Sequence, residues 1–122
     1  MTSYVVLLPG DESHWSSATM EERKATYAKH TRFAEMLAAR GDKITGGAEL
    51  THSSGARVVR RVGDRLEVTE GPYAESVEQL TGFYCVDTDD LDGLLECVGI
   101  LAGPDGGIEV REAVESSDPE AG

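Results

Sequence analysis

The sequence predicts a single α+β domain with a ferredoxin-like, split β-α-β order that carries an inserted β-hairpin. Three observations lead to this prediction. A length of 122 residues suits one hydrophobic core. Apolar residues make up 39% of the chain and gather in short runs with the period of a strand or a helix. The expected elements follow one another as β-α-β, hairpin and β-α-β, without repeats or long linkers.

The chain should begin with a strand and a long helix. Residues 3–9 are apolar on both alternating faces, which is typical of a strand covered on both sides. Residues 10–15 have the composition of a polar turn. Thr19 and Glu22 have the spacing of a capping box, so the helix should begin there and run to about Arg40.

Gly41 should end this helix in a left-handed conformation. At about 100° per residue, one stripe of the helix is mainly apolar and should face the sheet. The stripe consists of Tyr27, His30, Phe33, Ala34, Leu37 and Ala38. Arg23 lies one turn before Tyr27 on the same stripe, which is an unusual place for a charged side chain.

The remaining elements are shorter. Residues 63–65 should connect the strands of the hairpin, and Glu-Gly-Pro-Tyr at 70–73 has turn composition. We expect strands at 43–50, 56–62, 66–69, 82–87 and 108–112, one helical turn at 76–80, and a helix from Thr88 or Asp89 to about Ala102, ended by Gly103 and Pro104. Residues 1–114 would form the domain, and the acidic tail at 115–122 should be disordered.

Both long helices should lie on one face of an antiparallel sheet. The other face then needs a cover, and the sequence contains no third long helix to supply it. A second copy is the simplest cover, so we expect a homodimer whose sheets pack face to face.

The charge balance argues against two classes of partner. The chain has 23 acidic and 11 basic residues, a formal net charge of −12, which disfavours nucleic acid and anionic membrane surfaces. The basic cluster of Arg57, Arg60 and Arg61 would be divided between two faces of a strand. No signal peptide or membrane span is expected at the N-terminus, which favours a cytoplasmic location.

Cys85 and Cys97 are expected to be free, mostly buried thiols, with a disulfide as the less favoured alternative. A zinc site is disfavoured because the sequence has no CxxC motif and its three histidines are scattered. We therefore expect neither a metal nor a cofactor.

Several segments match a known family, in order and at sensible spacing. They are YVVLLPGDESHW (4–15), TMEER (19–23), Gly41, EVTEGPYAES (67–76), QLTGFYCVDTDDLD (79–92) and GGIEVREAV (106–114). On these segments the chain resembles the YCII-related family, and within it the DGPF subgroup, over roughly residues 3–112. The resemblance implies a dimeric α+β barrel.

The resemblance implies two kinds of activity. The broader family includes small enzymes that act on cyclic or aromatic acids with a histidine–aspartate pair, and DGPF-type members often look like partners of extracytoplasmic-function sigma factors. His30 stands eleven residues before Gly41, at the spacing of the family histidine. The subgroup's aspartate and phenylalanine are Glu70 and Tyr73 here. The family's second aspartate has no clean match, and we do not assign it to Asp105.

His30 has three interpretations. It is a neutral core histidine, a hydrogen-bond donor to a substrate, or a general base whose ordinary pKa of about 6.5 suits proton abstraction near neutrality. As a base it would need a carboxylate on its other ring nitrogen, for which Glu70 and Asp11 are the candidates. Both also suit a structural role, Glu70 in its turn and Asp11, with Glu12, after the first strand.

A second group of residues could hold the substrate. Arg23 suits a clamp for an anionic ligand, although an ion pair with Asp11 or Glu12, or a side chain that extends to solvent, would also explain it. Tyr27, Tyr73 and Trp15 would line the site, or pack at a pocket wall or dimer seam.

Two functions follow from these interpretations. One is a site for a small organic acid, with cofactor-free lyase or isomerase chemistry based on His30. The other is a regulatory partner of a sigma factor that acts by protein contact, for which an acidic surface is suitable.

Overall fold

The computed structural model of the chain describes residues 1–103 and 106–114. Its helices are α1 (Glu12–Ser17), α2 (Met20–Ala39) and α3 (Leu91–Val98), and a short 3-10 turn lies at Ser53–Gly55. Its strands are β1 (Thr2–Asp11), β2 (Lys43–Glu49), β3 (Arg57–Val62), β4 (Arg65–Glu70), β5 (Glu78–Thr88) and β6 (Glu109–Glu112). Pro104, Asp105 and the expected tail at 115–122 lie outside the described residues.

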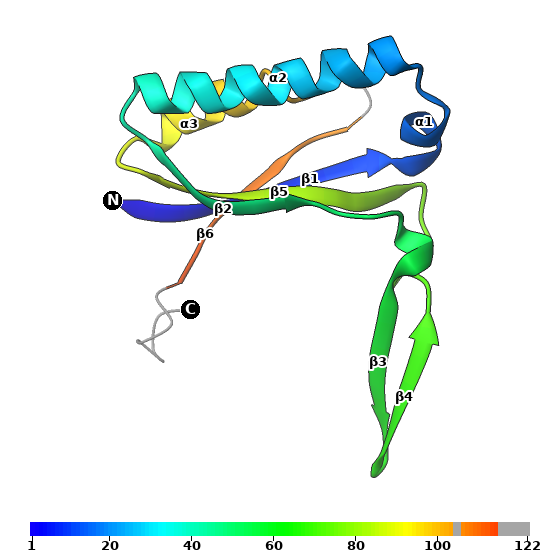
Figure 1. Ribbon diagram of the computed structural model, residues 1–122. Coiled ribbons are helices and arrows are strands. Elements are labelled where there is room, and N and C mark those ends of the chain that lie inside the picture. Colours follow the sequence, from blue (N-terminus) through cyan, green and yellow to red (C-terminus); the bar gives the residue numbers. More distant parts are fainter. Residues whose placement is uncertain (104–105, 115–122) are drawn as a thin grey trace.

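Four of the strands form one antiparallel sheet. Its order is β2-β5-β1-β6, so β1 and β5 occupy the centre. Helices α2 and α3 cover one face of this sheet, and the β3–β4 hairpin projects from the opposite side (Figure 1). An antiparallel sheet with helices packed on it confirms the predicted α+β class.

The start of α2 is fixed by local sequence, as predicted. The Thr19 hydroxyl accepts a hydrogen bond from the Glu22 amide at 3.1 Å, and the Glu22 carboxylate accepts one from the Thr19 amide at 3.1 Å. The helix ends one residue before Arg40, and Gly41 follows with φ of +82°. The capping box and the left-handed stop are both confirmed.

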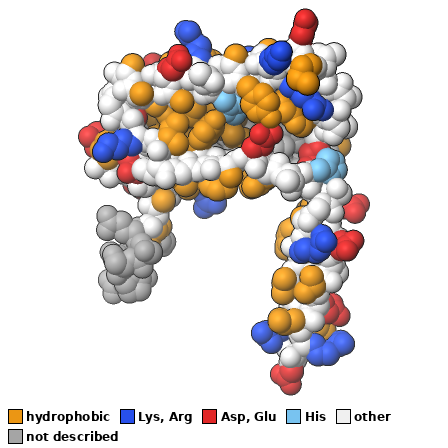
Figure 2. Space-filling model, viewed as in Figure 1, with side chains coloured by type: hydrophobic (Ala, Val, Ile, Leu, Met, Phe, Trp, Pro, Cys, Tyr) orange, Lys and Arg blue, Asp and Glu red, His pale blue; other side chains and the backbone are white. Residues whose placement is uncertain are grey.

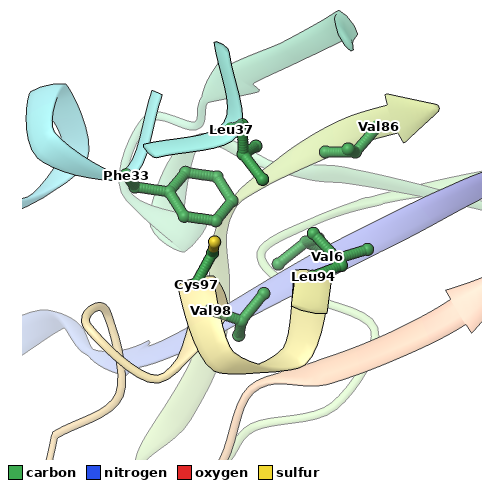
Figure 3. Close-up of a cluster of buried hydrophobic side chains, with 7 residues drawn as sticks. All are labelled: Val6, Phe33, Leu37, Val86, Leu94, Cys97 and Val98. Carbon is green, nitrogen blue, oxygen red and sulfur yellow. The ribbon is translucent and has the colours of Figure 1, made fainter. Parts of the chain in front are cut away.

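The core lies between α2, α3 and the sheet (Figure 3). It consists of Phe33 and Leu37 from α2, Leu94, Cys97 and Val98 from α3, and Val6 and Val86 from the sheet. Phe33 is fully buried, whereas Tyr27 on the same predicted stripe is 48% exposed. The reason is length: the eight residues of α3 span about 12 Å and cannot cover all 20 residues of α2.

The helix expected from Thr88 or Asp89 to about Ala102 is shorter at both ends. Asp90 is its N-cap and accepts a hydrogen bond from the Gly93 amide at 3.0 Å. The Thr88 hydroxyl instead donates to the Asp42 carboxylate at 2.7 Å, which holds the end of β5 against the end of α2. After Val98 the chain continues in tight turns rather than helix.

Two local predictions are wrong. Part of the expected polar turn at 10–15 is the helix α1, because the Asp11 carboxylate accepts hydrogen bonds from both the amide and the hydroxyl of Ser13 and so caps a helix. The helical turn expected at 76–80 is instead the start of β5, where Glu78 pairs with Asp11 of β1. Long-range pairing outweighs local helix preference there.

The inserted hairpin is confirmed; β3 begins one residue later than predicted, and β4 extends one residue further at each end. Val62 pairs with Arg65, so the connection consists of residues 63 and 64 alone. β3 and β4 pair only with each other and form a separate two-stranded sheet. We call residues 57–70 the arm.

The sheet face opposite the helices carries apolar side chains. Val5 pairs with Cys85, and Leu7 pairs with Phe83. These residues alternate with Val6 and Val86, which face the helices, and they are half-buried. No element within the described part of the chain packs over this apolar sheet face.

Candidate functional site

A histidine and a tyrosine meet where α2 passes over β5. His30 Nδ1 lies 2.7 Å from the hydroxyl oxygen of Tyr84, which is a short hydrogen bond. The Tyr84 ring also packs against Phe33, with 5.1 Å between ring centroids, so the core fixes its position. Figure 2 shows a histidine side chain in a hollow between the long helix and the edge of the sheet, visible from outside and surrounded by hydrophobic side chains.

A second pair lies beside the first along α2. The Tyr27 hydroxyl donates to the carboxylate of Glu49, with both oxygens at 3.1 Å. The Trp15 ring from α1 meets the Tyr27 ring edge-on, with centroids 5.5 Å apart. We call His30, Tyr84, Tyr27, Glu49 and Trp15 the His30 cluster.

Burial sets the protonation states of the central pair. Desolvation lowers the pKa of His30 below its ordinary value of 6.5, and the negative charge of Glu49 opposes this shift. Desolvation also raises the pKa of Tyr84 above 10.0. At neutral pH the imidazole is therefore uncharged and the phenol keeps its proton.

Two arrangements of protons satisfy this hydrogen bond. If Tyr84 donates to Nδ1, the imidazole proton sits on Nε2, which can then only donate. If Nδ1 donates to Tyr84, then Nε2 presents a basic lone pair and the phenol proton is free to point to a ligand. Only the second arrangement makes His30 a general base.

The absence of a side chain at Gly47 leaves room for the Tyr84 ring. It lies on β2 directly opposite Tyr84 and has φ of +146°. A Cβ atom there would lie 2.5 Å from the backbone oxygen of Phe83 and 3.2 Å from Cδ1 of the Tyr84 ring. A larger residue would therefore strain the strand and displace the phenol from His30.

Arg23 lies at the N-terminal end of the His30 cluster. Its Nη2 donates to the backbone oxygens of Trp15 and Ser16 at 3.0 and 3.2 Å, so it closes the C-terminus of α1. The guanidinium also lies 5.2 Å from the centre of the Trp15 ring. Its Nε is buried and has no acceptor among the described residues. Neither Asp11 nor Glu12 pairs with it: the Asp11 carboxylate accepts hydrogen bonds from Ser13, and the Glu12 carboxylate accepts hydrogen bonds from the amide and hydroxyl of Ser53.

The structure does not bring the other predicted site residues to His30. Asp11 caps α1. Glu70 ends the arm, where its exposed carboxylate lies 3.8 Å from Arg57. Tyr73 is 82% exposed and lies over Arg60. The carboxylate whose charge reaches His30 is instead that of Glu49.

Sequence reasoning missed Tyr84 and Glu49. Tyr84 lies two residues before Val86, on the same helix-facing side of β5. The expected strand at 82–87 already contained this signal. Glu49 offered no such signal. Its position depends on the pairing of β2 with β5, and that register shifts between Ile44 and Gly46.

Two open hollows lie away from His30. One, of about 290 Å³, is lined by Met1, Arg40, Gly41, Asp42, Asp89 and Asp90. The other, of about 440 Å³, lies at the base of the arm and is lined by His52, Ser53, Ser54, Glu70, Gly71, Pro72, Glu75, Ser76 and Gln79. Glu70 thus faces this second hollow rather than the His30 cluster.

Three further features concern metals, membranes and thiols. Within residues 1–103 and 106–114, no three histidine, cysteine, aspartate or glutamate side chains are grouped as ligands for a metal ion. No helix in those ranges has the length and apolar character needed to cross a membrane. Both cysteines are free, with Cys97 buried and Cys85 half-buried.

Comparison with known proteins identifies a family and a relative. The sequence model of the YCII-related domain matches residues 2–115. An uncharacterised protein of Rhizobium meliloti (strain 1021) is 32% identical over 111 residues, which cover 88% of this chain and 89% of that protein.

Proposed function

The chain belongs to the YCII-related domain family, and from this premise we propose that its His30 cluster binds a small organic acid and moves a proton on it without a cofactor. The single observation that carries the proposal is the 2.7 Å hydrogen bond between His30 and Tyr84. A neutral imidazole bonded to a protonated phenol is a suitable acid–base pair at neutral pH.

In this proposal Nδ1 of His30 donates to the Tyr84 oxygen and Nε2 removes a proton from a carbon next to a carboxylate or carbonyl group of the ligand. The Tyr84 hydroxyl then donates to the oxygen on which negative charge develops. The Glu49 carboxylate stabilises the imidazolium that forms. Return of the proton to another carbon completes an isomerisation, whereas loss of a leaving group completes a lyase reaction.

The spacing along α2 suggests how the acid is held. Arg23, Tyr27 and His30 lie on one face of the helix, and the seven-residue step from Arg23 to His30 corresponds to about 10 Å. A ligand carboxylate near the free N–H groups of Arg23 would place the other end of a small acid at His30. Trp15 and Tyr27 would form the wall between these points.

Titration of ¹⁵N-labelled protein with a panel of small mono- and dicarboxylic acids tests the proposal. We expect at least one acid to shift the side-chain signals of both His30 and Arg23, and we expect His30→Ala to abolish any turnover while the fold stays intact. His52→Ala is the matched control, since His52 lies at the base of the arm. If no acid binds and His30→Ala unfolds the protein, His30 is a packing residue.

A regulatory role in contact with a sigma factor is the second candidate. The observation that favours it is the net charge of −12, which would complement a basic DNA-binding face. Purification of the tagged chain from its native cells at moderate salt, followed by mass spectrometry, separates the two functions. A stoichiometric sigma factor supports regulation, and a retained small acid that is lost in His30→Ala supports the site.

The proposal includes a ferredoxin-like protomer in a dimeric α+β barrel and membership of the DGPF subgroup. The strand order β2-β5-β1-β6 and the uncovered apolar sheet face with Val5, Leu7 and Phe83 support the barrel. The turn after Glu70, with Gly71 at φ of +98°, supports the subgroup. The free thiols of Cys85 and Cys97 agree with a cytoplasmic location.

A further inference from the structure

The arm has no hydrophobic core of its own. β3 and β4 are joined through six residue pairs, and every residue of β4 is exposed. A two-stranded ribbon is at best marginally stable in water without a third strand or a packed surface. An arm in this extended position therefore needs a surface outside its own protomer to pack against.

The two faces of the arm differ. Val59, Leu66 and Val68 share one face, which we call the bare face, and they are 60%, 61% and 61% exposed. The opposite face carries Arg60, which lies under the Tyr73 ring and donates to the Thr69 hydroxyl at 3.3 Å. On that opposite face Val58 is half-buried and Val62 is exposed, so the bare face has the larger apolar area to bury.

The charge of the arm is opposite to that of the rest of the chain. Of the 11 basic and 23 acidic residues, the arm holds four and three, a net charge of +1. The remaining seven basic and 20 acidic residues leave the rest of the chain at −13. The surface that complements the arm best is therefore one like the chain's own acidic body.

The position of the arm also selects its partner. The arm descends from the end of the sheet on the side of the uncovered apolar face (Figure 1), and Figure 2 shows hydrophobic side chains along it. Its six-residue strands extend about 20 Å, whereas stacked sheets lie about 10 Å apart. A second copy packed on the uncovered face would lie beside the arm, and the arm would reach past that copy's sheet.

We propose that the arm of each protomer docks on the rest of a second copy, with the bare face, which also carries Arg57 and Arg61, against that copy's acidic surface. This inference rests on the homodimer of the proposed function and goes beyond it, because it makes the arm a main source of dimer affinity. The exchange is reciprocal, as two-fold symmetry requires.

Adjacent residues of β4 provide a matched pair of variants. Val68→Glu places a charge on the bare face, and Thr69→Glu places the same charge on the opposite face of the same strand. Both positions are exposed, so neither change disturbs the packing of the protomer. Sedimentation equilibrium of the full chain should show a wild-type dimer that Val68→Glu weakens by more than about tenfold and Thr69→Glu by less than about threefold. Raising the salt concentration should weaken the wild-type dimer as well.

The outcomes distinguish the role of the arm from the existence of the dimer. Equal dimer dissociation constants for wild type and Val68→Glu would overturn the role of the arm and leave the dimer standing. A wild-type chain that stays monomeric at millimolar concentration would overturn both. Hydrogen exchange gives an independent check without a variant: the arm amides should be protected above the dimer dissociation constant and exchange freely below it. Protection that does not depend on concentration would contradict the proposal.

Discussion

The two halves of α2 differ in what their inner faces contact. The C-terminal half contributes Phe33 and Leu37, both buried against α3 and the sheet. The N-terminal part, as far as the middle of the helix, contributes Arg23, Tyr27 and His30, which are exposed or half-buried and bond to polar groups of α1, β2 and β5. The C-terminal part of α2 thus stabilises the fold, and its N-terminal part presents titratable groups. The difference arises because α3 covers only the C-terminal part.

The largest expected effect lies in the buried half. Leu37 is 1% exposed and packs in the centre of the core, so Leu37→Ala should lower the free energy of unfolding by about 2–5 kcal/mol. Tyr27→Ala, on the same stripe but 48% exposed, should cost much less stability. Urea denaturation of the two variants measures the difference. Equal losses would mean that the two halves contribute alike to the core.

A substitution at Gly47 tests whether backbone strain in β2 displaces Tyr84 from His30. Gly47→Ala forces a side chain into a left-handed conformation 2.5 Å from the Phe83 oxygen, and we expect a loss of about 1–3 kcal/mol together with a displaced Tyr84 ring. Gly46→Ala is the control, since its Cβ would lie 3.8 Å from Cys85 in ordinary contact. The His30 ring signals in NMR spectra should move in the first variant only.

Gly93 and Arg40 should be energetically coupled at the end of α2. A Cβ on Gly93 would lie 2.0 Å from Nη2 of Arg40, which pairs with Asp42 and Asp90 at 3.0 and 3.1 Å. Gly93→Ala should therefore change the stability little, because the cost of moving Arg40 away from its two carboxylates offsets the gain of about 1 kcal/mol that alanine brings to a helix. In an Arg40→Ala background the same change should stabilise the protein by about 1 kcal/mol. A double-mutant cycle by thermal unfolding measures the difference between the two backgrounds, and equal changes in both would rule out the clash.

The smallest expected effect is the pH dependence of stability due to His30. Its folded-state pKa lies below 6.5, so the unfolded chain takes up the proton more readily than the folded one. The contribution of neutral His30 to the free energy of unfolding is complete above the pKa of His30 in the unfolded chain. It is lost as the pH falls from about 6.5 through the folded-state pKa. His30→Gln should remove this part of the pH dependence. Identical pH profiles of unfolding for the two proteins would show that burial does not shift His30.

The buried half could be predicted from sequence, but only part of the site could be. The capping box at Thr19 and the apolar stripe through Phe33 and Leu37 are local signals, and both are correct. The partners of His30 depend on how β2 and β5 pair, and local sequence does not predict the register shift after Ile44. Sequence alone therefore predicts Glu70 or Asp11 as the carboxylate beside His30, whereas Glu49 is the one whose charge reaches it.

The most direct test of the central claim is the NMR titration of ¹⁵N-histidine-labelled protein, with Tyr84→Phe as the comparison. The account predicts that His30 titrates below 6.5, that its Nδ1 signal reports a hydrogen bond, and that Tyr84→Phe changes that signal while His14 and His52 stay the same. A His30 that titrates at or above 6.5 and does not respond to Tyr84→Phe would contradict the acid–base pair.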